Sequence, residues 1–162
     1  MLKKFFAVFV TCFALCASAS AEELYNTPIV TVENFKVVGD SPFKLGELTS
    51  DLIIERLVDS QKFSVLEYSQ EAEVRQDKKF EPDYLVKGTI EIQKPKASVI
   101  KVIVDFELVK AKTNELVWGR RVWEENEFVP KNKITIIHDT IYRTADKVVG
   151  RLVADMDSGK IF

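Results

Sequence analysis

The residues from Asp83 to Trp118 read DYLVKGTIEIQKPKASVIKVIVDFELVKAKTNELVW, and apolar and polar side chains alternate along much of this stretch. Between Val99 and Val109 every even-numbered position is apolar, and charged residues fall between them. A period of two is typical of a strand with one face in the core and the other in water. The apolar positions are Ile100, Val102, Val104, Phe106 and Leu108. The pattern predicts a strand of a half-buried antiparallel sheet.

A second strand precedes this one, and a third follows it. From Asp83 to Ile92 the same alternation is present, and we expect that strand to break at Pro95. The residues Lys112 to Glu115 form a predicted turn, because Asn114 tolerates a positive φ and can bond to its own backbone. The third strand therefore begins at Leu116.

The third strand loses its alternation near Gly119. Trp118 and Val122 share one parity, whereas Trp123 has the other. A β-bulge at Gly119 explains this pattern. A twisted edge strand with apolar residues on both faces explains it equally well, and both interpretations stay open at this point.

The remaining elements are predicted from propensity and periodicity. We expect a strand over 28–38, an amphipathic helix over 44–59, a short strand over 63–66 and a polar helical connection over 67–76. The third meander strand ends near Phe128, and a last helix begins at Pro130. Its expected apolar stripe comprises Ile134, Ile137, Ile141, Ala145, Val148, Val149, Leu152 and Val153.

The predicted order is therefore β-α-β-α-β-β-β-α. We expect an α/β chain of the α+β kind, in which helices pack against a single mixed, mainly antiparallel sheet.

The N-terminus has the features of a secretory signal peptide over residues 1–21. Two lysines precede an apolar run that is too short for a stable membrane span, and Ala19 and Ala21 provide a small-residue cleavage site. We expect residues 22–162 to form a single periplasmic domain. Lipidation is not expected, because Leu15 precedes Cys16 and Thr11 precedes Cys12, where a lipoprotein signal has a small residue. Association with the outer membrane stays open.

The exported chain would carry no cysteine, so neither a disulfide nor thiol chemistry is expected. The formal net charge of the whole chain is −2, and it becomes −4 once Lys3 and Lys4 are removed. A mildly acidic exported domain is a poor candidate for binding nucleic acid.

The sequence offers little catalytic chemistry. His138 is the only histidine, and the sequence has neither a phosphate-binding glycine loop nor a nucleophile elbow. The carboxylates of Glu124, Glu125 and Glu127 leave a small hydrolase as one hypothesis, since paired carboxylates can perform acid–base catalysis. A solvated charged face is the simpler interpretation, and we predict no enzyme, no cofactor, no metal site and no small-molecule substrate.

A binding surface is easier to place. Trp118 and Trp123 have opposite parity, so at least one of them could be partly exposed as a binding anchor, while packing of both in the core is the simpler expectation. We name Arg120, Arg121 and Trp123 as candidate partner-binding residues, with an exposed edge strand as the alternative. Basic residues of neighbouring strands and turns could gather at one end of the sheet, or be scattered and solvated; they are Lys94, Lys96, Lys101, Lys110, Lys112, Arg120 and Arg121.

Four segments in the same order resemble the periplasmic domain shared by the CsgG and LpoB families. They are IVTVENF over 29–35, SQKFSVLE over 60–67, DYLVKGTI over 83–90 and FELVKAKTNELVW over 106–118. The resemblance covers nearly the whole predicted domain.

The resemblance implies a non-enzymatic domain that works through its surface. CsgG-type members assemble an outer-membrane export channel in curli secretion, and LpoB-type members activate a penicillin-binding protein that synthesises peptidoglycan. The chain lacks room for the hairpins that build the CsgG pore, so we expect no pore from this protein alone. The expected partners are an envelope protein, either a secretion component or a peptidoglycan synthase, and a second copy of the chain.

Overall fold

The computed structural model describes residues 27–39, 44–66 and 81–162. In these ranges it contains six strands, two α-helices and one 3-10 helix. They are β1 (Ile29–Val32), β2 (Lys36–Val38), α2 (Leu45–Asp59), β3 (Ser64–Leu66), β4 (Tyr84–Lys96), β5 (Val99–Lys110), β6 (Leu116–Glu127), the 3-10 helix η2 (Pro130–Asn132) and α3 (Lys133–Asp157). The predicted signal peptide and the helical connection over 67–76 lie outside the described residues.

The strands form one mixed sheet in the order β3-β1-β4-β5-β6, and β2 pairs with β4 beyond the end of β1. The three long strands are antiparallel to one another, whereas β1 pairs in parallel with both β3 and β4, and β2 pairs in parallel with β4. The predicted α+β class is therefore confirmed.

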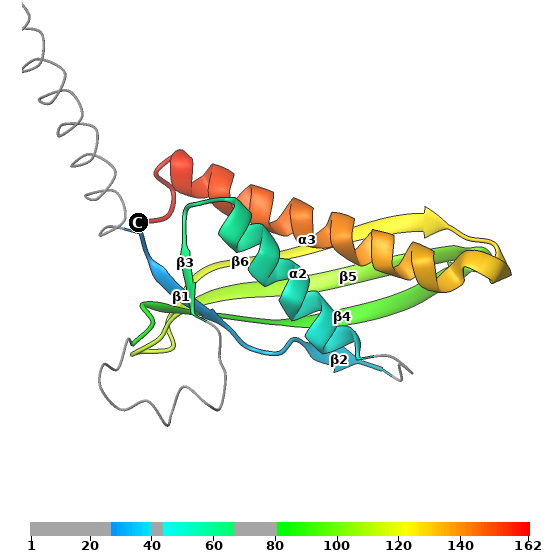
Figure 1. Cartoon of the computed structure of the whole chain (residues 1–162), viewed down its shortest axis with the longest axis horizontal. Helices are drawn as coiled ribbons and strands as arrows, with labels where there is room; N and C mark the ends of the chain where they lie inside the picture. Colours follow the sequence, from blue (N-terminus) through cyan, green and yellow to red (C-terminus); the bar gives the residue numbers. More distant parts are fainter. Residues whose placement is uncertain (1–26, 40–43, 67–80) are drawn as a thin grey trace, which may run out of the picture.

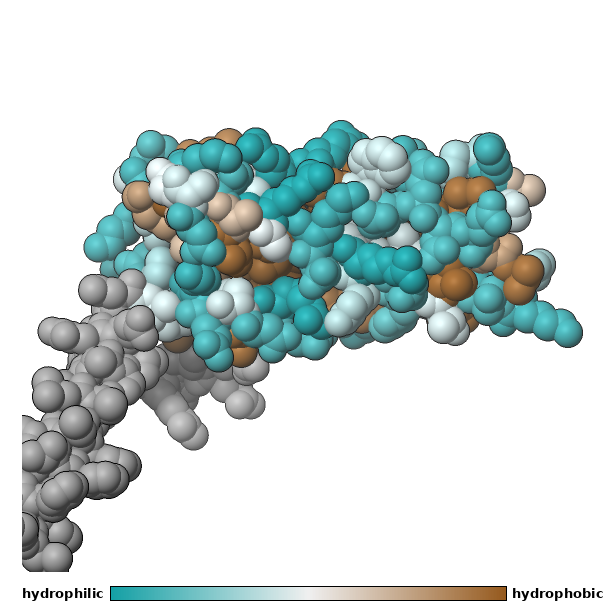
Figure 2. Space-filling model, turned by 90° about the horizontal axis from the view of Figure 1, so that it is seen from above, coloured by the Kyte–Doolittle hydropathy of each residue, from teal (hydrophilic) through white to brown (hydrophobic). Residues whose placement is uncertain are grey.

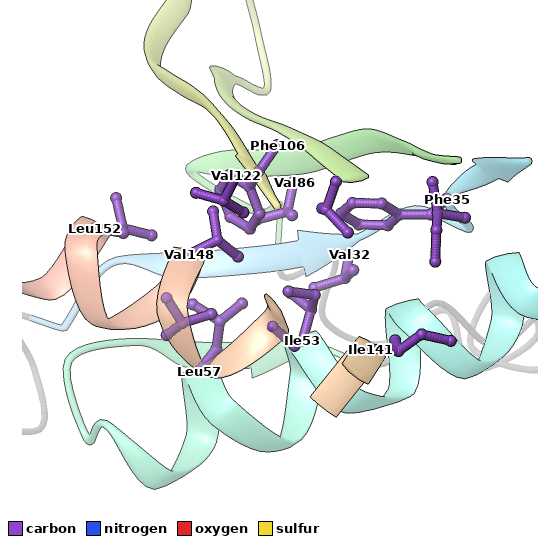
Figure 3. Close-up of a cluster of buried hydrophobic side chains, with 14 of the residues drawn as sticks. Val32, Phe35, Ile53, Leu57, Val86, Phe106, Val122, Ile141, Val148 and Leu152 are labelled. Carbon is purple, nitrogen blue, oxygen red and sulfur yellow. The ribbon is translucent and has the colours of Figure 1, made fainter. Parts of the chain in front are cut away.

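The molecule has two layers, because both α-helices lie on the same face of the sheet (Figure 1). The core fills the space between the layers, where Phe106 and Val86 of the sheet face Ile53 of α2 and Val148 of α3 (Figure 3). The even-numbered apolar residues of β5 are all buried on this side, as the alternation predicts. No described helix covers the other face of the sheet.

The predicted strand over 28–38 is two strands. The chain leaves the sheet between β1 and β2 so that Phe35 can turn into the core, where it is 3% exposed. The Ser50 hydroxyl of α2 accepts a hydrogen bond from the Phe35 N–H at 3.0 Å and lies 3.2 Å from the Glu33 carbonyl oxygen. Burying the backbone of this connection requires such partners, and α2 supplies them.

The break predicted at Pro95 is also wrong. β4 continues to Lys96 and reverses through Ala97 and Ser98 into β5. The ladder between β4 and β5 is irregular between Gln93 and Lys96, so the missing N–H of Pro95 interrupts no regular pairing. The predicted turn before β6 is confirmed, with Asn114 at a φ of 57°.

The last helix begins later than predicted. Residues Pro130 to Asn132 form a 3-10 turn, and α3 begins at Lys133. Its apolar stripe faces the sheet from Ile137 onward, but Ile134 is 60% exposed and does not belong to the core. None of the described helices is long and apolar enough to cross a membrane.

Candidate functional site

The strand β6 ends the sheet and pairs with only one neighbour, β5. It is twelve residues long, and the edge of a strand presents N–H and C=O groups that another chain can pair with. Its bulge lies at Val117, since Leu108 is opposite Trp118 and Val109 is opposite Leu116. The bulge predicted at Gly119 is therefore misplaced. The alternative, apolar residues on both faces of an edge strand, also describes β6.

Trp123 lies on the sheet face that the described helices leave uncovered. It stands opposite Ile103 in the ladder and is 50% exposed. The ammonium group of Lys101 lies 4.1 Å from the centre of its ring, and that of Lys147 lies 5.8 Å from it. A half-exposed tryptophan ring beside two cationic groups is suited to anchoring a protein partner.

Arg121 lies on the same face as Trp123, two residues away. Its guanidinium is 3.6 Å from a carboxylate oxygen of Glu91 and 3.6 Å from one of Asp105. Both ion pairs are long, and the arginine side chain is 59% exposed. Exposed pairs of this length hold a side chain weakly, so Arg121 can turn to a partner's carboxylate at small cost.

Arg120 lies on the other side of β6, and the structure does not bring it together with Arg121 and Trp123. Its guanidinium is 3.6 Å from Asp155 of α3 and stacks over the Trp118 ring with 5.6 Å between the guanidinium carbon and the ring centre. The surface formed by Arg121, Trp123 and the edge of β6 is called the β6 surface below.

Asp155 is a residue that sequence reasoning missed. Trp118 Nε1 donates a hydrogen bond to Asp155 Oδ2 at 3.0 Å, and Lys160 Nζ donates to Oδ1 at 3.0 Å. These two bonds, followed by the charges of Lys160 and Arg120, hold the pKa of Asp155 below its usual value. The carboxylate joins the C-terminal end of α3 to β6. A lone acidic residue in a helix carries no sequence signal of this role.

The three glutamates near the end of β6 do not converge. Glu124 faces α3 and pairs with Lys147, whereas Glu125 faces the uncovered side and lies 3.2 Å from Lys101. Successive residues of a strand point to opposite faces, so a cluster in sequence is divided in space. Among residues 27–39, 44–66 and 81–162, no group of three or more acidic, histidine or cysteine side chains could hold a metal ion.

His138 is exposed and lies beside an apolar groove between the first turns of α2 and α3. The groove has a volume of about 250 Å³ and is lined by Lys44, Leu45, Leu48, Ile134, Ile137 and His138. It is smaller than most ligand pockets. Among its lining residues only His138 and Lys44 are titratable, so the groove is better suited to apolar contact than to acid–base catalysis.

The seven basic residues proposed as a patch are divided among several places. Lys110 pairs with Glu115 at 2.8 Å, and Lys112 lies 3.9 Å from Glu81, both at the turn before β6. Lys94 and Lys96 lie at the far end of β4. One patch of seven is therefore not formed.

No protein-family model matches the sequence, and no curated protein sequence matches it. Solved structures do share its fold. Protein CT253 of Chlamydia trachomatis superposes with a TM-score of 0.59 at 13% identity, over 79% of this chain and 96% of that one. Protein XCC0632 of Xanthomonas campestris superposes with a TM-score of 0.59 at 11% identity, over 82% and 88%.

PelC of Paraburkholderia phytofirmans, a dodecamer, superposes with a TM-score of 0.57 at 15% identity, over 76% of this chain and 86% of that one. At these identities the likeness establishes the architecture alone. None of the three carries the name of CsgG or LpoB, so that resemblance stays a prediction. What the comparisons establish is that this mixed sheet with two helices on one face is a fold that other bacterial proteins also adopt.

Proposed function

We propose that this protein is a non-enzymatic exported module that binds a partner protein in the cell envelope. The observation that carries the proposal is the β6 surface, a twelve-residue sheet edge with one neighbour that is flanked by the half-exposed Trp123 and the loosely paired Arg121. Strand addition to such an edge gains backbone hydrogen bonds, and aromatic and arginine anchors supply specificity. The predicted signal peptide supports export.

The test is site-specific photo-crosslinking in intact cells. A photoreactive residue at Leu116 or Glu127, near the two ends of β6, should capture a partner protein. The matched control is Val58 of α2, which is 53% exposed and lies on the helix layer. Capture of the same proteins in the same amounts from Val58 would contradict the proposal. A variant with Trp123→Ala and Arg121→Ala should lose the crosslink, whereas Arg143→Ala should keep it.

The resemblance to CsgG and LpoB supports two finer forms of this proposal. In the first, the partner is a secretion or outer-membrane component, and the module acts in its assembly. In the second, the partner is a peptidoglycan synthase that the module activates. Recovery of synthase peptides and faster glycan polymerisation by the purified synthase would support the second form. Crosslinks only between copies of the chain would favour a homo-oligomer, the state in which PelC was solved.

A further inference from the structure

One end of the molecule combines exposed aliphatic side chains with lysines that have no carboxylate partner among the residues that the structure describes. Phe128 N–H donates to the Ser98 carbonyl at 2.8 Å, so the hairpin tip of β4 and β5 lies against the segment that leads into η2 and α3. Lys94 and Lys96 come from the hairpin, and Lys131 and Lys133 come from η2 and α3. We call these four lysines, together with Val129 and Ile134, the hairpin end.

The hairpin end carries the two most exposed large hydrophobic side chains among the described residues. Val129 is 59% exposed and Ile134 is 60% exposed. Ile134 also lines the apolar groove of about 250 Å³, whose other walls include Leu45, Leu48 and Ile137. Figure 2 shows hydrophobic surface set among hydrophilic residues at the corresponding right-hand end of the view. These apolar atoms are in water unless something covers them.

The charged part has no carboxylate partner among the described residues. None of the four lysines forms an ion pair there, whereas Lys101 and Lys147 both do. Interaction with Lys94 lowers the pKa of Lys133, because a proton on one of the two amines disfavours a proton on the other. Two like charges that lie close together repel each other, and a bound anion would offset this repulsion. The whole chain is acidic, so this end differs in sign from the rest.

From this juxtaposition we propose that the hairpin end docks on the surface of a phospholipid bilayer with anionic headgroups. Lysines would lie at the level of the lipid phosphates, and Val129 and Ile134 would enter the boundary with the acyl chains. Lysine stems suit this position, since their methylene groups lie along apolar surface while the ammonium groups stay hydrated.

A membrane surface fits this end better than an acidic peptide does. The exposed aliphatic side chains stand on a loop and on the first turn of α3, and the groove beside them accommodates a few methylene groups but not a helix. Binding to a bilayer surface requires cationic groups beside exposed aliphatic side chains, and it does not require a long groove. The docked end also lies opposite the turn before β6, so most of the β6 surface stays accessible (Figure 1).

The experiment measures sedimentation of the protein, purified from the envelope of expressing cells, with vesicles. We expect binding to mixed phosphatidylcholine and phosphatidylglycerol vesicles, weaker binding at high salt, and little binding to phosphatidylcholine alone. Replacing Lys94→Gln should reduce the affinity about fivefold, and adding Lys133→Gln about fivefold more, by the usual contribution of a lysine near an anionic surface. Ile134→Ser should reduce it at unchanged charge.

Matched controls lie at the other end of the molecule. Lys110→Gln with Lys112→Gln removes the same charge at the turn before β6, and Val58→Ser removes an aliphatic side chain of α2 that is 53% exposed. Neither should change vesicle binding. Because Lys94→Gln relieves a repulsion, the variant should be at least as stable as the unaltered protein, so unfolding cannot account for its loss of binding.

Equal binding to neutral vesicles would overturn the inference, and so would equal losses in the control variants. Binding to an acidic polypeptide but not to anionic vesicles would overturn it in favour of a protein ligand. The inference does not depend on the partner proposed for the β6 surface. Crosslinks from Leu116, which lies at the other end of β6 from the hairpin end, test that function separately in the Lys94→Gln variant.

Discussion

At the scale of single residues, two glycines show how differently the same substitution can act. Gly88 lies in the middle of β4, and a Cβ there would meet both the ring of Phe35 and the backbone carbonyl of Asp105 at distances shorter than any real contact. The ring can move, but the carbonyl belongs to the ladder between β4 and β5. Gly150 lies on the exposed side of α3, and a Cβ there would meet nothing within 4 Å.

We therefore predict that Gly88→Ala lowers the free energy of unfolding by about 1–3 kcal/mol, the usual cost of overpacking. Gly150→Ala should raise it by about 0.5–1 kcal/mol, because alanine is the better helix former. Urea titration of both variants measures the two values. Equal changes in the free energy of unfolding for the two variants would contradict the close packing of Phe35 against Gly88.

Asp155 makes the stability depend on pH. Its folded pKa is lowered by the hydrogen bond from Trp118 and by Lys160, so the unfolded chain takes up the proton more readily. The stabilisation is complete above the ordinary carboxyl pKa of 3.8 and is lost as the pH falls through the lower folded value. Asp155→Asn should lower the melting temperature at pH 7, and the difference should shrink below pH 3.8. A constant difference at every pH would contradict this account.

At the scale of elements, α3 shows that an apolar residue can fit the helical periodicity of its neighbours and still not be buried. Ile134 and Ile137 fit the same apolar stripe in sequence, yet Ile137 is 6% exposed and Ile134 is 60% exposed. The sheet ends before it reaches the first turn of the helix, because β6 stops at Glu127 and η2 intervenes. Periodicity gives the direction of a side chain but not whether a partner is present there.

Ile137→Ala should therefore lower the free energy of unfolding by about 2–4 kcal/mol, through lost burial and the cavity that remains. Ile134→Ala should change it by less than about 0.5 kcal/mol, as exposed substitutions usually do. Thermal or urea denaturation distinguishes the pair. A cost for Ile134 equal to that for Ile137 would mean that the N-terminal turn of α3 is buried after all.

At the scale of the whole molecule, stability is concentrated around β5. This strand lies between β4 and β6 and is covered by α3, whereas β3 has three residues and only β1 as a strand neighbour. Amides in β5 should exchange hydrogen only by global unfolding, and amides in β3 by local opening. Hydrogen exchange followed by mass spectrometry measures both. Equal protection of the two strands would contradict a centre of stability at β5.

The candidate site could be predicted in part at this scale. The opposite parity of Trp118 and Trp123 allowed for one partly exposed tryptophan, but the simpler expectation that both pack in the core is wrong, since Trp118 is 6% and Trp123 is 50% exposed. The prediction that Arg120 belongs to the same surface as Arg121 was wrong, because neighbouring residues of a strand point to opposite faces. The partnership of Trp118 with Asp155 joins residues from two elements far apart in the chain, and no local pattern encodes it.

The sequence by itself determined the α+β class, the three-stranded antiparallel meander, the turn at Asn114 and both long helices, because period and turn chemistry are local properties. Tertiary structure alone decided that the first predicted strand divides around Phe35, that the bulge falls at Val117, and that Ile134 stays in water. Each of these outcomes depends on which distant backbone or side chain is present at a given point. Contacts between elements decide which distant group is present, and the sequence pattern along a single element carries no information about such contacts.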